Sequence, residues 1–203
     1  MRLFHLSDLH IGKRVNEFSM IEDQKYILER ILDLAEKEMP DGVILAGDIY
    51  DKQIPSAEAV QVFDEFITRL AERKFPVFVI SGNHDSAERL AFGGRLLNSR
   101  GIYLSPVYDG TVMKIPIADQ YGTVWIHLLP FIRPAAVRRV FEDESDLITD
   151  VQSAVRAVIS HMDTYCAKLL FRDMPSVPQP CRASPTEDLH RCGQSDRMLR
   201  SAC

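Results

Sequence analysis

The chain has 203 residues, of which 46% are hydrophobic and 26% are charged, and its formal net charge is −5. This composition is typical of a soluble globular protein, and no apolar run reaches the roughly 18–20 residues that span a bilayer. The negative charge argues against a protein that holds nucleic acid through bulk positive charge, but it does not exclude an enzyme whose bound metal ions neutralise phosphate. No apolar leader precedes the polar segment at Ser7, so we expect no signal peptide, no membrane contact and a cytoplasmic location.

Strand and helix patterns alternate over the first 80 residues. Short apolar runs predict three buried strands, at residues 3–6, 43–46 and 77–80. Apolar residues at helical spacing predict a helix over residues 20–38, which Pro40 ends. Ser56 is a candidate N-cap for a second helix, which ends before Pro76. Each strand–helix–strand unit has the usual size for parallel pairing, so this alternation predicts an α/β fold.

Shorter elements follow. Ser86 is a candidate N-cap for a helix that extends to about residue 98. Strand-like runs then cover residues 102–104, 111–117 and 123–129. Pro130 and Pro134 bracket a connection, and a last helical pattern covers residues 148–162.

The composition changes after about residue 165. The following segment is rich in Pro, Ser and Arg and has no sustained period. It also contains all four cysteines, Cys166, Cys181, Cys192 and Cys203, whose wide spacing lacks the close pairs of a structural zinc site. We therefore predict one domain over residues 1–165 and an atypical, disordered tail over residues 166–203.

A polar segment follows each of the first three predicted strands. These segments are Ser7-Asp8-Leu9-His10, Gly47-Asp48-Ile49-Tyr50-Asp51 and Gly82-Asn83-His84-Asp85. Because adjacent parallel strands end at the same edge of a sheet, we expect these side chains to meet at the edge where open α/β sheets carry out chemistry. Oxygen donors combined with imidazole suit Mn²⁺, Fe²⁺ or Zn²⁺. The pattern predicts a two-metal phosphoesterase site.

Four of these residues are candidate metal ligands. In an extended segment Asp8 and His10 point the same way and can share one ion, and Asp48 on the central strand can bridge two ions. Asn83 supplies a neutral oxygen, which limits the negative charge that an approaching phosphate meets. The flanking Gly47 and Gly82 allow the backbone to turn sharply.

Three further residues have expected roles beside the metal ions. His84 follows a ligand and is expected to face the substrate, where it protonates the leaving oxygen or stabilises charge on phosphorus. Asp85 is expected to orient the His84 imidazole, and Asp51 to act in a similar supporting position. Each segment alone is also compatible with ordinary turn residues, and His5 and His127 are expected to be structural histidines.

The three segments together resemble the calcineurin-like metallophosphoesterase superfamily. Within it, the fuller stretches Phe4 to Lys13, Leu45 to Asp51 and Ile80 to Ser86 are similar to the SbcD family of nuclease subunits, and the resemblance covers residues 1–165. It implies a β-sandwich flanked by helices and a two-metal site that uses Mn²⁺, with Mg²⁺ or Fe²⁺ as alternatives. Asp8, His10, Asp48 and Asn83 would be the ligands and His84 the phosphate-facing histidine.

The resemblance also implies an activity and partners. It implies a 3′-to-5′ exonuclease on duplex DNA and an endonuclease on single strands and hairpins, which acts in DNA replication, recombination and repair. The expected partners are DNA, a second copy of the chain and an SbcC-type SMC-like ATPase.

The chain departs from the family after about residue 165. The family completes its metal site with a histidine after a further strand and then with a Gly-His-x-His motif, and neither is present; His161 lies in a helical pattern instead. We therefore expect a sandwich that is incomplete at its C-terminus, from a truncated or frame-shifted coding sequence. Two alternatives to the nuclease stay open: an inactive fragment that retains dimer or partner binding, and a phosphodiesterase of small substrates.

Overall fold

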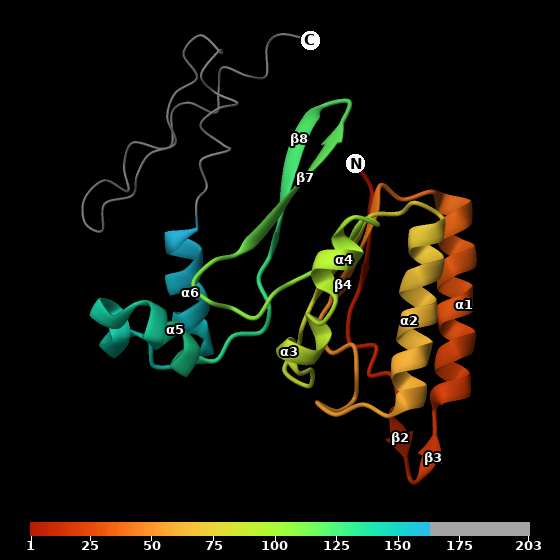
Figure 1. Ribbon diagram of the computed structural model, residues 1–203, viewed down its shortest axis with the longest axis horizontal. Coiled ribbons are helices and arrows are strands. Elements are labelled where there is room, and N and C mark those ends of the chain that lie inside the picture. The colour runs from red at the N-terminus through yellow and green to blue at the C-terminus, as the bar shows by residue number, and fades with distance from the viewer. Residues whose placement is uncertain (163–203) are drawn as a thin grey trace, which may run out of the picture. The chain divides into compact units, whose positions relative to one another are not determined.

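A parallel sheet of four strands organises residues 1–162, the part of the chain that this computed structural model describes (Figure 1). The strands are β1 (Leu3–Leu6), β4 (Gly42–Ala46), β5 (Val77–Ile80) and β6 (Ile102–Leu104), and they lie in the order β1-β4-β5-β6. All three pairs are parallel, which confirms the predicted strands and the α/β fold. The tail predicted over residues 166–203 lies outside the described residues.

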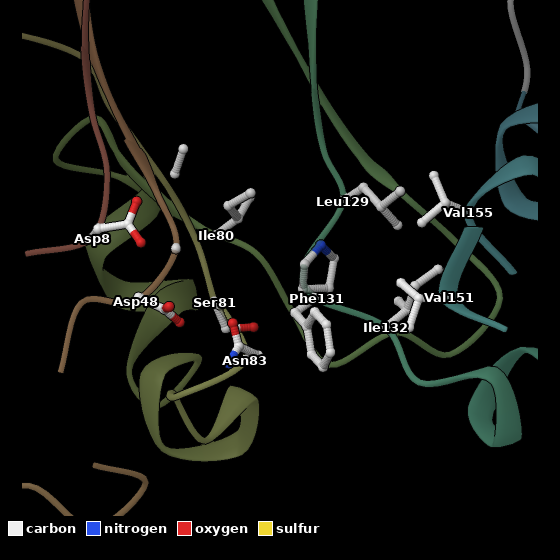
Figure 2. Close-up of a pocket in the computed structure, with 14 residues that line it drawn as sticks. Asp8, Asp48, Ile80, Ser81, Asn83, Leu129, Phe131, Ile132, Val151 and Val155 are labelled. Carbon is white, nitrogen blue, oxygen red and sulfur yellow. The ribbon is translucent and has the colours of Figure 1, made fainter. Parts of the chain in front are cut away.

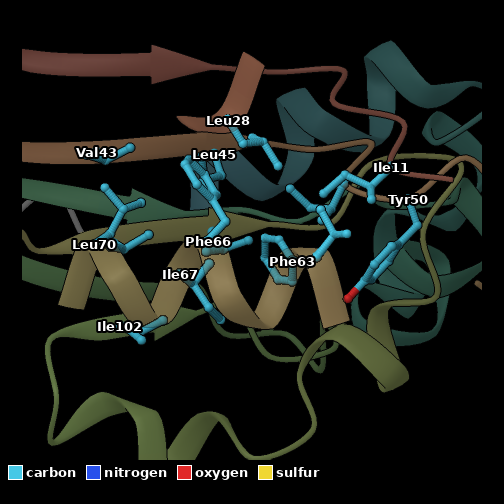
Figure 3. Packing of buried hydrophobic residues seen from close by; sticks show 14 of the residues in the cluster. Ile11, Leu28, Val43, Leu45, Tyr50, Phe63, Phe66, Ile67, Leu70 and Ile102 are labelled. Atoms are coloured by element: carbon cyan, nitrogen blue, oxygen red, sulfur yellow. The ribbon is translucent and has the colours of Figure 1, made fainter. Parts of the chain in front are cut away.

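Two long helices cover one face of this sheet. They are α1 (Ile21–Glu38) and α2 (Ala57–Glu72), which run side by side in Figure 1. As predicted, Ser56 caps α2, and its hydroxyl accepts from the backbone N–H of Ala59 at 3.2 Å. Phe63, Phe66 and Leu70 of α2 pack with strand residues such as Val43 and Leu45 in one buried cluster (Figure 3). No helix within residues 1–162 has both the length and the apolar character that crossing a membrane requires.

A β-hairpin packs against the opposite face of the sheet. Its strands are β7 (Met113–Asp119) and β8 (Gly122–Leu128), which pair in antiparallel register. Ile115 and Leu128 of the hairpin form a buried cluster with Phe78 of β5, whose ring stacks on Tyr103 at 5.3 Å between centroids. Within the described residues this hairpin is the second β layer that the sandwich prediction requires.

The C-terminal third of the described chain has its own small core. The helices α5 (Pro134–Val140) and α6 (Val151–His161) flank the short 3₁₀ helix η1 (Glu142–Leu147), and they bury Val137, Ile148 and Val158. The connection that Pro130 and Pro134 were predicted to bracket lies between β8 and α5, as expected, but α5 itself was not predicted. Pro134 occupies the first turn of α5, where a missing N–H is harmless.

Two other local features differ from the sequence prediction. The helix predicted to extend from Ser86 to about residue 98 is divided into α3 (Ala87–Leu90) and α4 (Gly94–Asn98), because Gly93 adopts a φ of +76° between them. A small hairpin, β2 (Arg14–Val15) and β3 (Phe18–Ser19), also forms where no element was predicted. Asn16 and Glu17 at its turn both have positive φ, as a two-residue hairpin turn requires.

Candidate metal centre

The three polar segments meet beyond the carboxyl ends of β1, β4 and β5. The segments that follow β1 and β4 continue side by side in nearly parallel direction. The backbone N–H of Asp8 donates to Gly47 O at 3.2 Å, and that of His10 donates to Asp48 O at 2.9 Å. One step further, Ile11 forms a parallel bridge with Tyr50. The backbone therefore carries the first and second segments side by side at the predicted edge.

Three candidate ligands adopt unusual backbone conformations. Asp8, His10 and Asp48 have φ values of +57°, +44° and +49°. The extended course that we expected for Asp8 to His10 is therefore wrong, because β1 ends at Leu6. Asp and His tolerate the left-handed region better than most residues, and such conformations cluster at functional sites when the surrounding structure enforces them.

The side chains of His10, Asp48 and His84 form a compact group of potential metal donors. One donor atom from each lies within 4.8 Å of the others. The Nε2 atom of His10 lies 3.9 Å from Asp8 Oδ1 and 3.9 Å from Asp48 Oδ2, and the rings of His10 and His84 meet edge to face at 4.8 Å. Asp8 thus joins the group through His10, even though the segment between them is not extended.

One buried nitrogen in this group has no hydrogen-bond partner. The Nδ1 atom of His10 is buried, and the nearest carboxylate oxygen across from it, Asp51 Oδ1, lies 3.7 Å away. The Nε2 atom, on the other side of the ring, lies 3.9 Å from carboxylate oxygens of both Asp8 and Asp48, so it is the nitrogen that could share a cation with them. The mixed nitrogen and oxygen donors therefore fit a divalent transition metal.

The imidazole of His84 is held from one side. Its Nδ1 atom lies 3.0 Å from the backbone carbonyl of Asp51, and because a carbonyl only accepts, Nδ1 carries the hydrogen. This hydrogen bond raises the pKa of His84, and the negative charges of Asp48, Asp51 and Asp85 add to the effect. The backbone N–H of His84 also donates to Asp48 Oδ1 at 2.9 Å. The Nε2 atom is left for a ligand or substrate.

The carboxylate of Asp85 contacts other groups than the sequence predicted. Instead of orienting the His84 ring, its carboxylate accepts three backbone N–H groups, from Ile49 at 3.1 Å, Tyr50 at 2.9 Å and Gly82 at 2.8 Å. It is only 6% exposed. Asp85 therefore fastens the segment after β4 to the segment after β5.

The two glycines fit the close approach of these segments. A Cβ atom on Gly82 would lie 2.1 Å from Asp48 Oδ1 and 2.3 Å from Asp48 N. Gly47 has a φ of +86°, and a Cβ there would lie 3.0 Å from the Gly82 Cα. The side chain of Asp48 occupies space that only glycine at position 82 leaves open.

A cavity of about 350 Å³ opens beside this group (Figure 2). Asp8, Asp48 and Asn83 line one wall. The opposite wall is apolar and consists of Leu129, Phe131, Ile132, Val151 and Val155. Asn83, which we predicted as a ligand, is exposed and shares the wall with both aspartates.

The sequence did not point to Gln24, which lies on α1. Its Nε2 donates to the backbone carbonyls of Leu9 at 3.0 Å and His10 at 2.8 Å, and its Oε1 accepts from Gly12 N–H at 3.0 Å. A signal was present, because Gln24 lies between Ile21 and Leu28 on the apolar stripe of the helix. A polar side chain on such a stripe requires a partner.

The remaining histidines lie elsewhere. His5, on β1, is exposed, so the prediction of a satisfied structural histidine does not fit its position. His161 stacks on Phe141, and its Nε2 lies 3.3 Å from Glu144 Oε1. His127 lies on β8. Within residues 1–162 none of these three belongs to the donor group at the sheet edge.

Comparisons with known proteins agree with this geometry. Residues 1–174 match the model of a family described as calcineurin-like phosphoesterase. The chain is 34% identical over 165 residues to the SbcD component of nuclease SbcCD from Staphylococcus epidermidis, and 32% identical over 163 residues to that from Staphylococcus saprophyticus. These alignments cover 81% and 80% of the chain but only 42% of each relative.

Proposed function

Because the chain belongs to the calcineurin-like phosphoesterase family, we propose that its cluster of His10, Asp48 and His84 is the centre of a metal-dependent phosphodiesterase that acts on DNA. The observation that carries this proposal is the convergence of three donor atoms within 4.8 Å at the carboxyl edge of the sheet. The family is metal-dependent, and His10 Nε2, which lies 3.9 Å from a carboxylate oxygen of both Asp8 and Asp48, is placed to share a cation with them.

Asp8, His10, Asp48 and Asn83 would hold the metal. Following the resemblance to SbcD-type nuclease subunits, the metal would be Mn²⁺, with Mg²⁺ or Fe²⁺ as alternatives. When bound, divalent ions at such a site neutralise phosphate charge and make water a nucleophile at neutral pH. Asp48 is suited to a bridging place, because it is 8% exposed and lies between His10 and the backbone of His84.

His84 would act on the substrate. With Nδ1–H directed at the Asp51 carbonyl, Nε2 is the ring atom that can deliver a proton to the leaving oxygen. An alternative is that His84 is itself a ligand, which its place among the three clustered donors supports.

Asp51 and Asp85 would support the site without contacting the substrate. The carbonyl of Asp51 orients His84, and the Asp51 carboxylate lies near His10. Asp85 holds the segments that carry Asp48 and Asn83 at a fixed separation through three N–H groups. Removing supporting groups of this kind typically weakens metal binding about 10–100-fold.

The choice of DNA as substrate rests on the relatives, which are named as components of a nuclease. The chain spans about two fifths of their length, so the following features are part of the proposal. They are 3′-to-5′ exonuclease activity on duplexes, endonuclease activity on single strands and hairpins, roles in recombination and repair, a homodimer, and an SbcC-type ATPase as partner.

The test is cleavage of end-labelled duplex and hairpin DNA by the purified chain with Mn²⁺. Cleavage that chelation and the Asp48→Ala substitution both abolish would support the proposal. Cleavage that persists in Asp48→Ala would contradict it. Hydrolysis of a small chromogenic phosphodiester without DNA cleavage would favour a small-substrate esterase. A folded chain that binds DNA or itself but hydrolyses neither substrate would favour a non-catalytic role.

A further inference from the structure

A second cavity adjoins the candidate metal centre. It has a volume of about 280 Å³ and extends toward α3 and the start of α5. Five residues line both cavities, namely Ser81, Gly82, Asn83, Phe131 and Ile132. The two spaces therefore meet along Asn83 and Phe131, beside the atoms that would hold the metal. A substrate bound at the metal centre can extend into this second cavity.

Two residues that line the second cavity each carry a buried hydroxyl oxygen without a hydrogen-bond partner. These oxygens are the Oγ of Ser81, a residue that is 3% exposed, and the phenolic oxygen of Tyr108. Buried hydroxyls are normally paired, and an unpaired one is unfavourable. Burial and the neighbouring charge of Asp109 raise the pKa of Tyr108, so its hydroxyl stays protonated and can donate. A ligand in the cavity that accepts hydrogen bonds would give both groups a partner once their side chains turn toward it.

A cationic side chain lines the same cavity. Arg133 is exposed at the N-cap of α5, and within residues 1–162 it forms no ion pair or side-chain hydrogen bond. Arg138 in the same helix is different, because its guanidinium donates to the carbonyl of Ile148. A guanidinium matches the geometry of phosphate oxygens and can bind two of them at once.

The acidic residues of the cavity do not cancel this arrangement. Asp85 uses its carboxylate on three backbone N–H groups. Glu88 accepts from the hydroxyl of Ser86 at 2.9 Å, and its pKa is lowered by its own backbone N–H and by that hydroxyl. Glu88 is therefore the only carboxylate in the lining that accepts no backbone N–H from another segment. The same lining contains one arginine and two residues with unpaired hydroxyl groups.

We propose that this second cavity binds the phosphate next to the scissile one, with Arg133 as its cationic anchor and Ser81 and Tyr108 as hydrogen-bond donors. The inference rests on the proposed function and narrows its substrate class to polynucleotides, since a mononucleotide or a small diester has no second phosphate. Arg133 is a specificity-determining residue in this account.

The test measures binding of a fluorescein-labelled single-stranded oligodeoxynucleotide to the full chain by anisotropy at several salt concentrations. Arg133→Ala is expected to raise Kd and to reduce the slope of log Kd against log salt by about 0.7, the value for one lost phosphate contact on a single strand. Arg133→Lys is expected to keep the slope. Arg139→Ala is the matched control, because Arg139 is exposed on the same helix outside the cavity.

A second variant separates binding from folding. Ser81→Ala removes an unpaired buried hydroxyl, so it is expected to leave the free chain at least as stable while it weakens oligonucleotide binding. An unchanged slope for Arg133→Ala, with DNA cleavage that still depends on Asp48, would overturn the cavity inference and leave the proposed function standing. A reduced slope with cleavage that does not depend on Asp48 would support the phosphate site and overturn the proposed function.

Discussion

The side-chain amide of Gln24 donates to the backbone carbonyl of His10 at 2.8 Å, so a residue of α1 fixes the segment that carries a candidate ligand. The same side chain also holds Leu9 and Gly12 through their backbone groups. His10 has a φ of +44°, and a conformation of this kind persists only when the surroundings enforce it. Gln24 provides that enforcement from outside the three polar segments.

Gln24→Ala is therefore expected to weaken Mn²⁺ binding about 10–100-fold, as loss of a supporting residue does at other metal sites. Isothermal titration of the full chain with Mn²⁺ measures the affinity. Gln61→Ala on the exposed side of α2 is the control and should bind Mn²⁺ as the unsubstituted chain does. Equal affinity in Gln24→Ala would show that the segment holds its shape without this residue.

Gly82→Ala tests the packing of the second and third segments. Its Cβ would lie 2.1 Å from Asp48 Oδ1, so Asp48 or the segment after β5 must move. We expect a loss of about 1–3 kcal/mol in the free energy of unfolding together with loss of Mn²⁺ binding. Gly94→Ala is the control, because its nearest neighbour, Leu104 Cβ, would lie at an ordinary 3.5 Å. Denaturant unfolding and metal titration of both variants give the comparison.

Phe78→Ala tests whether the β7–β8 hairpin is held by the sheet. The side chain of Phe78, on β5, is fully buried against the hairpin. Its truncation is therefore expected to lower the free energy of unfolding by about 3–5 kcal/mol. Phe92→Ala, at a side chain that is 85% exposed, should change it by less than about 0.5 kcal/mol. Similar urea midpoints for the two variants would contradict the packing described for this face.

The cap of α6 gives a pH-dependent prediction. Asp150 accepts from the backbone N–H and the hydroxyl of Ser153, and these hydrogen bonds lower the pKa of Asp150 below its ordinary 3.8. A lowered pKa means that this contribution to stability is fully present above the ordinary value and is lost as the pH falls through the lowered one. The difference in unfolding free energy between the unsubstituted chain and Asp150→Ala should thus shrink in acid.

Urea unfolding at neutral pH and at successively lower pH values measures this difference. Asp146→Ala removes a nearby exposed carboxylate and is the control for charge alone. A difference that stays constant into acid would show that the cap does not depend on the ionised carboxylate.

The strands of the sheet could be predicted because each is a short apolar run followed at once by polar turn residues. Val77–Ile80 illustrates this, since Pro76 precedes it and Gly82 follows. Because Asp8, Asp48 and Asn83 come directly after these strands, their position at the carboxyl edge of the sheet could be predicted in the same way. Helix ends were predicted where a capping residue was present, as at Ser56.

The remaining features depend on contacts that no local pattern contains. The three N–H groups on Asp85 include two from a segment about 35 residues earlier, so its role follows from the approach of two loops. The break at Gly93 and the start of α5 at Pro134 were missed for another reason. Glycine and proline interrupt helices in one context and end or begin them in another, and tertiary packing decides which.

The central claim is that a metal binds between His10 and Asp48. The most direct test is anomalous diffraction at the manganese edge from crystals of the chain soaked in Mn²⁺. The account predicts a peak within bonding distance of His10 and Asp48 that disappears in Asp48→Ala. No peak at this edge of the sheet, or peaks only at other surface carboxylates, would contradict it.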